Sequence, residues 1–127
     1  MKFGIFFEMS TPRPFTAEVE SAVLHNALEQ ARLADELGFD WVWAVEHHFL
    51  EEYSHCSAPE VVLAAVAAQT ERVRIGHGAV VCVPEMNHPI RVAERCATLD
   101  ILSRGRLEVG TARSSTWTEL GGFMADP

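Results

Sequence analysis

The chain has 127 residues and a formal net charge of −8, and 48% of its residues are hydrophobic. The acidic balance, without a Lys/Arg cluster, argues against surfaces that bind nucleic acid or an anionic membrane. No stretch approaches the roughly 20 apolar residues of a membrane span, and no signal peptide is recognisable, so we expect a cytoplasmic protein. The length allows one domain, residues 1–127, but not a complete eight-unit barrel, which needs roughly 250 residues.

Hydrophobic patterning predicts four strands and three helices that alternate along the chain. The strands are apolar runs typical of a sheet covered on both faces, and the helices repeat apolar residues at helical spacing. In chain order we expect a strand at 2–7, a helix at 17–37, a strand at 40–45, a helix at 59–70, a strand at 73–83, a helix at 89–103 and a strand at 107–111. The tail, 112–127, is predicted to be a loop with at most the first residues of a helix.

Local signals mark the helix ends. Thr16 is a suitable N-cap for the first helix, and Gly38 is a suitable stop. The second helix is expected to start at Ser57 with Pro59 in its first turn, and its nearly all-round apolar character predicts deep burial. Pro89 opens the third helix.

Strands that alternate with helices of this length require crossover connections and a parallel sheet. A segment of a (β/α) barrel and a doubly wound open sheet both satisfy this requirement. The doubly wound fold usually carries G-x-G-x-x-G after its first strand, whereas this chain has Glu8-Met9-Ser10 there. Gly76 and Gly78 form a G-x-G inside a strand, without the third glycine. The pattern therefore favours the barrel segment.

Ligands bind at the carboxyl ends of parallel strands in both architectures, so polar residues there are the candidate functional residues. An acid, imidazoles, an arginine and hydroxyl groups that converge on one rim can transfer protons near neutral pH and bind an anionic group. The strand-end positions are Glu8, Glu46-His47-His48 with Phe49, the segment 77–87, and Thr111-Ala112-Arg113-Ser114-Ser115. The structural alternative is that these histidines are simply hydrogen-bonded within the fold.

Other uses of the same residues are less well supported. Five residues on or close to the second strand end are chemically able to ligate zinc: Glu46, His47, His48, His55 and Cys56. Adjacent histidines point to opposite sides of an extended backbone, and no H-E-x-x-H or H-x-H is present, so we predict no metal site. No base can be assigned to Cys56 as a nucleophile. Trp41 and Trp43 are expected to pack in the core, and His77 is expected to have a surface or a packing role.

Four segments, in this order, closely resemble the bacterial luciferase-like flavin-dependent monooxygenases: MKFGIFFEM, GFDWVWAVEHHF, RVRIGHGAVV and HPIRVAERCATLDILSRGRLEVGTARSS. The resemblance implies a TIM-type barrel, of which this chain supplies about the first four strands and three helices. It also implies reduced FMN, usually delivered by a separate reductase, which reacts with molecular oxygen and oxygenates a small organic substrate. Some relatives instead use a deazaflavin and transfer hydride without oxygen.

The same resemblance assigns roles to two residues after the second strand. His47 matches the first histidine of the EHH motif, which lies beside the flavin and manages protons, so an acid/base role is implied. Glu46 matches the acid that precedes it and is expected to orient the rim.

The cofactor-binding residues implied by the resemblance lie after the third and fourth strands. Gly78 and Ala79 match small residues where relatives often carry a non-proline cis peptide against the flavin ring. Ala112 matches a position near the flavin, and Arg113 one where a guanidinium can approach the phosphate.

Four strands leave two unpaired edges and an open barrel interior, which exposes apolar side chains. We therefore expect residues 1–127 to be the N-terminal half of a truncated barrel chain, or to form a homo-oligomer. Three hypotheses remain open. The chain is part of a flavin monooxygenase, part of a deazaflavin-dependent oxidoreductase, or a non-catalytic half-barrel that pairs with itself or with a complementary chain.

Overall fold

A computed structural model describes residues 1–114 and 116–125, and within them four strands alternate with four helices. The four strands and the first three helices follow the predicted order. The elements are β1 (Gly4–Phe7), α1 (Ala17–Leu37), β2 (Trp41–Ala44), α2 (Pro59–Gln69), β3 (Arg74–Val81), α3 (Pro89–Leu102), β4 (Leu107–Ala112) and α4 (Trp117–Gly122). No helix in the described part of the chain is both long and apolar enough to span a bilayer.

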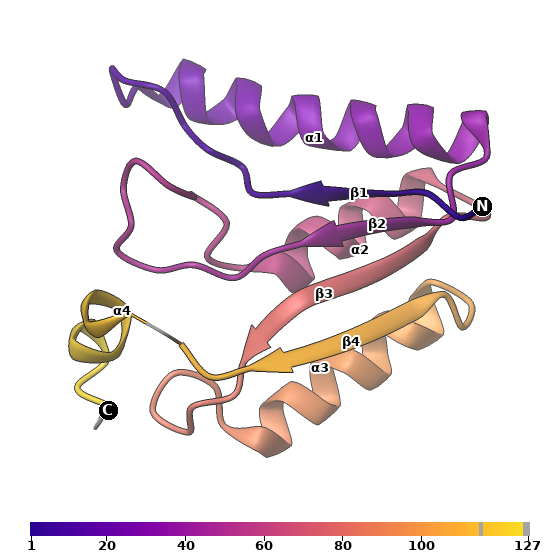
Figure 1. The fold of residues 1–127 in the computed structure, drawn as a ribbon. Helices are drawn as coiled ribbons and strands as arrows, with labels where there is room; N and C mark the ends of the chain where they lie inside the picture. Colours follow the sequence, from indigo (N-terminus) through magenta and orange to yellow (C-terminus); the bar gives the residue numbers. More distant parts are fainter. Residues whose placement is uncertain (115, 126–127) are drawn as a thin grey trace.

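The strands form one parallel sheet in the order β1-β2-β3-β4, side by side in chain order (Figure 1). Each crossover helix, α1, α2 and α3, lies between two neighbouring strands in sequence, which is the connection that parallel strands require. A doubly wound sheet reverses its strand order at a switch point, and this sheet does not. The α/β fold is therefore the predicted half of a (β/α) barrel.

The register separates two faces of the sheet. Ile5, Val42 and Ile75 pair across three strands, and all three belong to the apolar core between the sheet and the helices. Phe6 and Trp43 pair one position later, on the opposite face. Side chains alternate along a strand, so neighbouring positions lie on opposite faces of the sheet. The helices cover the face that carries Ile5, Val42 and Ile75.

The second face carries the two tryptophans of β2. Trp41 and Trp43 are half-buried and lie outside the core cluster, so their predicted core position is wrong. The Trp43 ring lies where a side chain on Gly76 would be, since a Cβ added there would meet the ring at 2.2 Å. Glycine at position 76 thus lets the indole lie flat against β3.

Most helix ends agree with the local signals. Thr16 caps α1 by accepting from the Val19 N–H at 3.3 Å, and Gly38 ends it with φ of 79°. The N-cap of α2 is Ala58 and not Ser57, because Pro59 already occupies the first helical position. Burial of α2 is also less complete than predicted: Val61 is exposed, and the buried residues are Pro59, Leu63, Val66 and Ala67.

The short helix α4 was not predicted beyond its first residues. Thr116 is its N-cap and accepts from the Glu119 N–H at 3.2 Å. Leu120 and Ala125 bury their side chains in a second apolar cluster with Val81, the last residue of β3, and Val83 of the following loop. This packing holds α4 at the carboxyl ends of the strands, beside loop 45–58 (Figure 1).

Candidate functional site

The carboxyl ends of the strands bring the predicted polar residues to one edge of the sheet. Glu8 follows β1, Glu46 and His47 follow β2, and Arg113 follows β4. All four strands point the same way, so these positions share one rim (Figure 1).

Glu46 is a buried carboxylate that joins β2 to β3. It is 7% exposed and accepts from the Val81 N–H at 2.9 Å, from Asn87 Nδ2 at 2.6 Å and from His48 Nε2 at 3.0 Å. Burial alone would raise its pKa, but the hydrogen bonds from His48, Val81 and Asn87 outweigh burial and hold the pKa of Glu46 below its usual value. Glu46 is therefore ionised at neutral pH and connects the ends of two strands.

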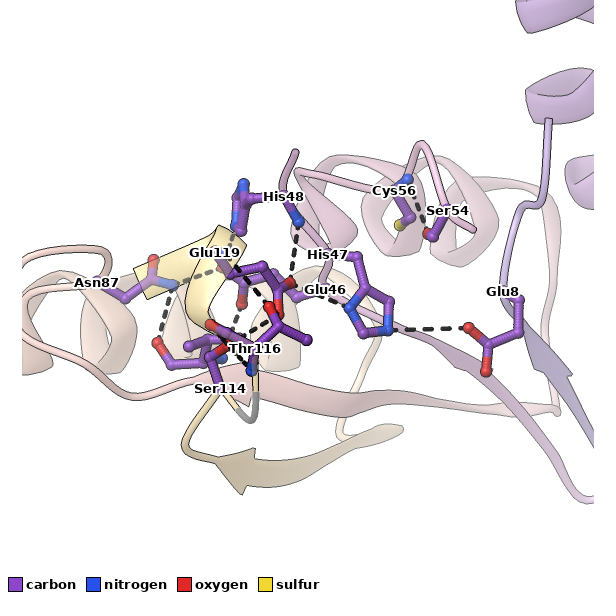
Figure 2. A network of polar contacts seen from close by, with 11 residues as sticks. Glu8, Glu46, His47, His48, Ser54, Cys56, Asn87, Ser114, Thr116 and Glu119 are labelled. Atoms are coloured by element: carbon purple, nitrogen blue, oxygen red, sulfur yellow. Dashed lines mark hydrogen bonds and ion pairs between the residues drawn. The ribbon is translucent and has the colours of Figure 1, made fainter. Parts of the chain in front are cut away.

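His47 lies between two carboxylates (Figure 2). Its Nδ1 is 3.1 Å from Glu119 Oε1, and its Nε2 is 3.9 Å from Glu8 Oε2. The Tyr53 ring packs edge-on against the imidazole, with 5.0 Å between the ring centroids. The ring is therefore held in one orientation, with one nitrogen toward each acid.

Glu119 was missed by sequence reasoning, and it is the most buried acid of the site. It is 2% exposed, and its Oε1 also accepts from the His48 N–H at 3.0 Å. The hydroxyl groups of Ser114 and Thr116 each donate to Oε2 at 2.7 Å. Burial alone would raise its pKa, but these hydrogen bonds, with that from His47, keep the pKa of Glu119 below its usual value.

A sequence signal for Glu119 was available. Thr116 and Glu119 have the S/T-x-x-E spacing of a capping box, which predicts a helix start at this place. The signal predicts α4, but not the contact with His47, which is 72 residues away in the chain. In the structure the Glu119 carboxylate turns to the Thr116 hydroxyl and to loop 45–58.

Glu8 completes the group of acids around His47. Its Oε2 is buried and has no hydrogen-bond partner among the described residues. A buried carboxylate oxygen without a donor is costly, so this atom favours a proton donor at the rim. Protonated His47 or a donor group on a bound molecule would satisfy it.

The predicted small residues of β3 lie at an irregular part of the sheet. The Gly78–Ala79 peptide bond is cis, and the pairing of β3 with β4 shifts between His77 and Val80. Gly110 of β4 allows this approach, because a Cβ added there would meet the His77 carbonyl oxygen at 2.7 Å. Gly78 and Ala79 are half-buried, so part of this strand end is accessible.

Ala112 and Arg113 lie at the exposed end of β4. No ion pair of the Arg113 guanidinium is present within residues 1–114 and 116–125. Ser114 turns away from solvent to bind Glu119, and Ser115 lies outside the described residues. The structure thus brings Ser114 into the His47 group and leaves Arg113 facing solvent.

The structure also shows where the other candidate residues lie. Burial raises the pKa of the Cys56 thiol to about 12, so this cysteine is not a thiolate nucleophile. His55 pairs with Glu20 of α1 at 3.2 Å. No group of three potential metal ligands is found in the described part of the chain. His77 is buried on the helix side of the sheet, which favours the packing role over the surface role.

The family of the chain follows from comparison with known proteins. Residues 1–127 match the family described as luciferase-like monooxygenase over their whole length. The chain belongs to the luciferase-like monooxygenase family. It is 34% identical, over 89% of its length, to the alkanal monooxygenase alpha chain of Photorhabdus laumondii. It is 32% identical, over 91% of its length, to the oxygenase component of the flavin-dependent trigonelline monooxygenase of Acinetobacter baylyi.

Solved structures agree with this luciferase-like fold. Monooxygenase RslO1 from Streptomyces bottropensis superposes on 99% of the chain with a TM-score of 0.86 and 41% identity. A coenzyme F420 dependent tetrahydromethanopterin reductase from Methanopyrus kandleri superposes with a TM-score of 0.70 at 23% identity, which shows the shared fold alone. The chain spans about a third of the length of its relatives: 30% and 31% of the two curated proteins and 37% of RslO1.

Proposed function

We propose that this chain is the N-terminal part of a flavin-dependent monooxygenase that uses reduced FMN and molecular oxygen to oxygenate a small organic substrate. One observation carries the proposal: His47 is oriented at the strand-end rim with its Nε2 toward Glu8. Family membership supports an oxidoreductase, and three relatives that are at least 30% identical, the alkanal and trigonelline enzymes and RslO1, are monooxygenases. A separate flavin reductase is part of the proposal, because the trigonelline relative is an oxygenase component.

The residues at the rim fit a reduced flavin. A planar ring needs small side chains where it contacts the backbone, and Gly78, Ala79 and Ala112 carry at most one methyl group each. A phosphate needs an available cation, and Arg113 is exposed beyond β4. The unpartnered Oε2 of Glu8 is a hydrogen-bond acceptor at the same rim.

Within this proposal, His47 holds and moves the proton, and Glu46 positions the rim. Bound FMN would supply the reducing electrons and the reaction with oxygen. The His47 imidazole has one nitrogen that can donate a hydrogen bond and one that can accept, which suits a general acid and base. Glu46 ties His48, next to His47, to the Val81 backbone and so to the end of β3.

The second candidate is a deazaflavin-dependent oxidoreductase on the same scaffold. The superposition with the reductase that depends on coenzyme F420 favours this possibility at the level of fold. Titration of the protein with FMN and with a deazaflavin, followed by fluorescence, separates the two candidates. We expect tighter binding of FMN, and a clear preference for the deazaflavin would replace the first candidate by the second.

The acid/base role is tested with His47→Ala in the flavin-loaded enzyme with its whole barrel present. We expect oxygenated product per reduced flavin consumed to fall by about tenfold or more, the usual effect of losing a positioned acid/base. His25→Ala is the matched control, because His25 is exposed on α1 and its hydrogen bonds in the described structure are with Ser21 of the same helix. Unchanged product per flavin in His47→Ala would remove His47 from the mechanism.

A further inference from the structure

Two adjacent histidines contact two different carboxylates through different ring nitrogens. His47 uses Nδ1 toward Glu119 Oε1 at 3.1 Å, whereas His48 uses Nε2 toward Glu46 Oε1 at 3.0 Å. The side chains project to different sides of loop 45–58 (Figure 2), and Glu8 lies near the other nitrogen of His47. Which nitrogen of each ring carries the proton then depends on whether the two acids accept or donate.

Glu119 is an acceptor in this arrangement. The His48 N–H already donates to Oε1, and the Ser114 and Thr116 hydroxyl groups lie at hydrogen-bond distance from Oε2. An ionised carboxylate has only lone pairs to offer, so the remaining contact requires a donor on Nδ1 of His47. The opposite tautomer would place a nitrogen lone pair against a carboxylate oxygen.

The same reasoning applies to Glu46 with the other nitrogen. Its Oε2 accepts from the Val81 N–H and its Oε1 from the Asn87 amide. His48 Nε2 must therefore donate to Oε1. Both assignments follow from which atoms meet and from the donors already present.

We propose that Glu119 and Glu46 hold His47 and His48 in opposite tautomers, with the proton on Nδ1 of His47 and on Nε2 of His48. Nε2 is then the nitrogen of His47 that gains and loses a proton. Glu119 is a positioning residue, since it acts through His47. The tautomers stand on the geometry alone, and their use in acid/base chemistry rests on the proposed function.

Glu8 gives this assignment a chemical consequence. The Nε2 of His47 lies 3.9 Å from the buried, unpartnered Oε2 of Glu8. A proton gained at Nε2 therefore arrives beside a carboxylate, while Glu119 holds the other nitrogen. Protonated His47 then has Glu119 at Nδ1 and Glu8 at Nε2, and the proton on Nε2 is the one that it exchanges.

The direct test is nitrogen NMR of the full chain labelled with ¹⁵N-histidine, at a pH where the imidazoles are neutral. Nitrogen shifts distinguish a protonated from an unprotonated ring nitrogen. We expect the Nδ1–H pattern for His47 and the Nε2–H pattern for His48 in the same spectrum. The same tautomer in both rings, or Nε2–H in neutral His47, would overturn the proposal.

Variants of Glu119 then test its role. Glu119→Ala should release His47 into a mixture of tautomers and leave His48 unchanged. Glu119→Gln should retain Nδ1–H, because an amide carbonyl can still accept from Nδ1. Glu20→Gln is the matched control. It removes an acid of α1 that pairs with His55, a different histidine of loop 45–58, and should leave His47 unchanged. An unaltered His47 in Glu119→Ala would exclude Glu119 as the positioning residue.

These measurements need neither flavin nor turnover, so they separate the inference from the proposed function. The wild-type spectrum also decides the tautomers if Glu119→Ala does not fold. In the flavin-loaded enzyme, Glu119→Ala should lower kcat by about tenfold with little change in KM, and Glu119→Gln should restore most of it. The expected tautomers together with unchanged turnover in Glu119→Ala would contradict the catalytic use of His47 and leave the tautomer assignment standing.

Discussion

At the scale of single residues, the rim is organised by two buried glutamates. Glu46 and Glu119 are almost fully removed from solvent, and neither is paired with a lysine or arginine in the described structure. A buried carboxylate is tolerated only when hydrogen bonds replace its water, and each of these acids has backbone and side-chain donors. These hydrogen bonds fix the position of each carboxylate, and the carboxylates in turn stabilise one arrangement of the loops that donate to them.

The Glu46 charge should contribute to stability in a defined pH range. Its pKa in the folded state lies below the ordinary value of 4.5, so the ionised form stabilises the fold above about pH 4.5, and this contribution is lost as pH falls through the folded pKa. Glu46→Gln should lower the free energy of unfolding by about 1–3 kcal/mol near pH 7, since an amide NH₂ would then face donors. The difference from wild type should shrink as the pH falls.

Urea unfolding at a series of pH values measures this difference. Glu29→Gln is the control, because Glu29 forms an exposed pair with Arg32 on α1 and should change stability by less than about 0.5 kcal/mol. A Glu46→Gln penalty that stays constant into acid would show that the carboxylate charge is not what holds the strand ends together.

How much of the site could be predicted depends on how local its signals are. Glu46 and His47 were predicted because they directly follow an apolar strand, and strand ends are where parallel sheets bind ligands. Glu119 was missed because its role is a contact between helix α4 and a loop residue 72 positions earlier in the chain. The orphaned oxygen of Glu8 is likewise a property of the folded chain, which no sequence pattern encodes.

At the scale of elements, alternation of apolar runs and helical repeats was enough to predict the order of strands and helices. Tertiary packing decided the rest. The second helix looks apolar all round in sequence, but only one side of α2 faces the core, and Val61 stays exposed. Helix α4 is only six residues long and depends on its cap and on the burial of Leu120.

The cap of α4 gives a prediction at this scale. Thr116→Ala should destabilise α4 by about 1 kcal/mol, because both the cap for the Glu119 N–H and a donor to the Glu119 carboxylate are lost. Hydrogen exchange of the Glu119 and Leu120 amides should then quicken by about fivefold. Thr116→Ser keeps the hydroxyl and serves as the control. Equal exchange in both variants would mean that packing alone holds α4.

At the scale of the whole molecule, one face and two edges of the sheet lack cover. β1 and β4 each pair with only one strand in the described structure, and Phe6 is 54% exposed on the face opposite the helices. Unpaired parallel edges and exposed aromatic side chains promote association. Because the relatives are about three times longer, we propose that further barrel units cover this face in the working enzyme.

The isolated 127-residue chain should therefore self-associate. In sedimentation velocity we expect the average mass to rise with concentration, and Phe6→Lys should shift the equilibrium toward the monomer by placing a charge on the uncovered face. Leu37→Lys is the control, because Leu37 is also apolar and exposed but lies at the end of α1 on the helix side. A titration with reduced FMN in the same experiment tests whether the associated chain binds the cofactor. If the chain stays monomeric at every concentration and binds reduced FMN tightly, both the self-association and the non-catalytic half-barrel are wrong, because the open face then needs no protein partner to form the site.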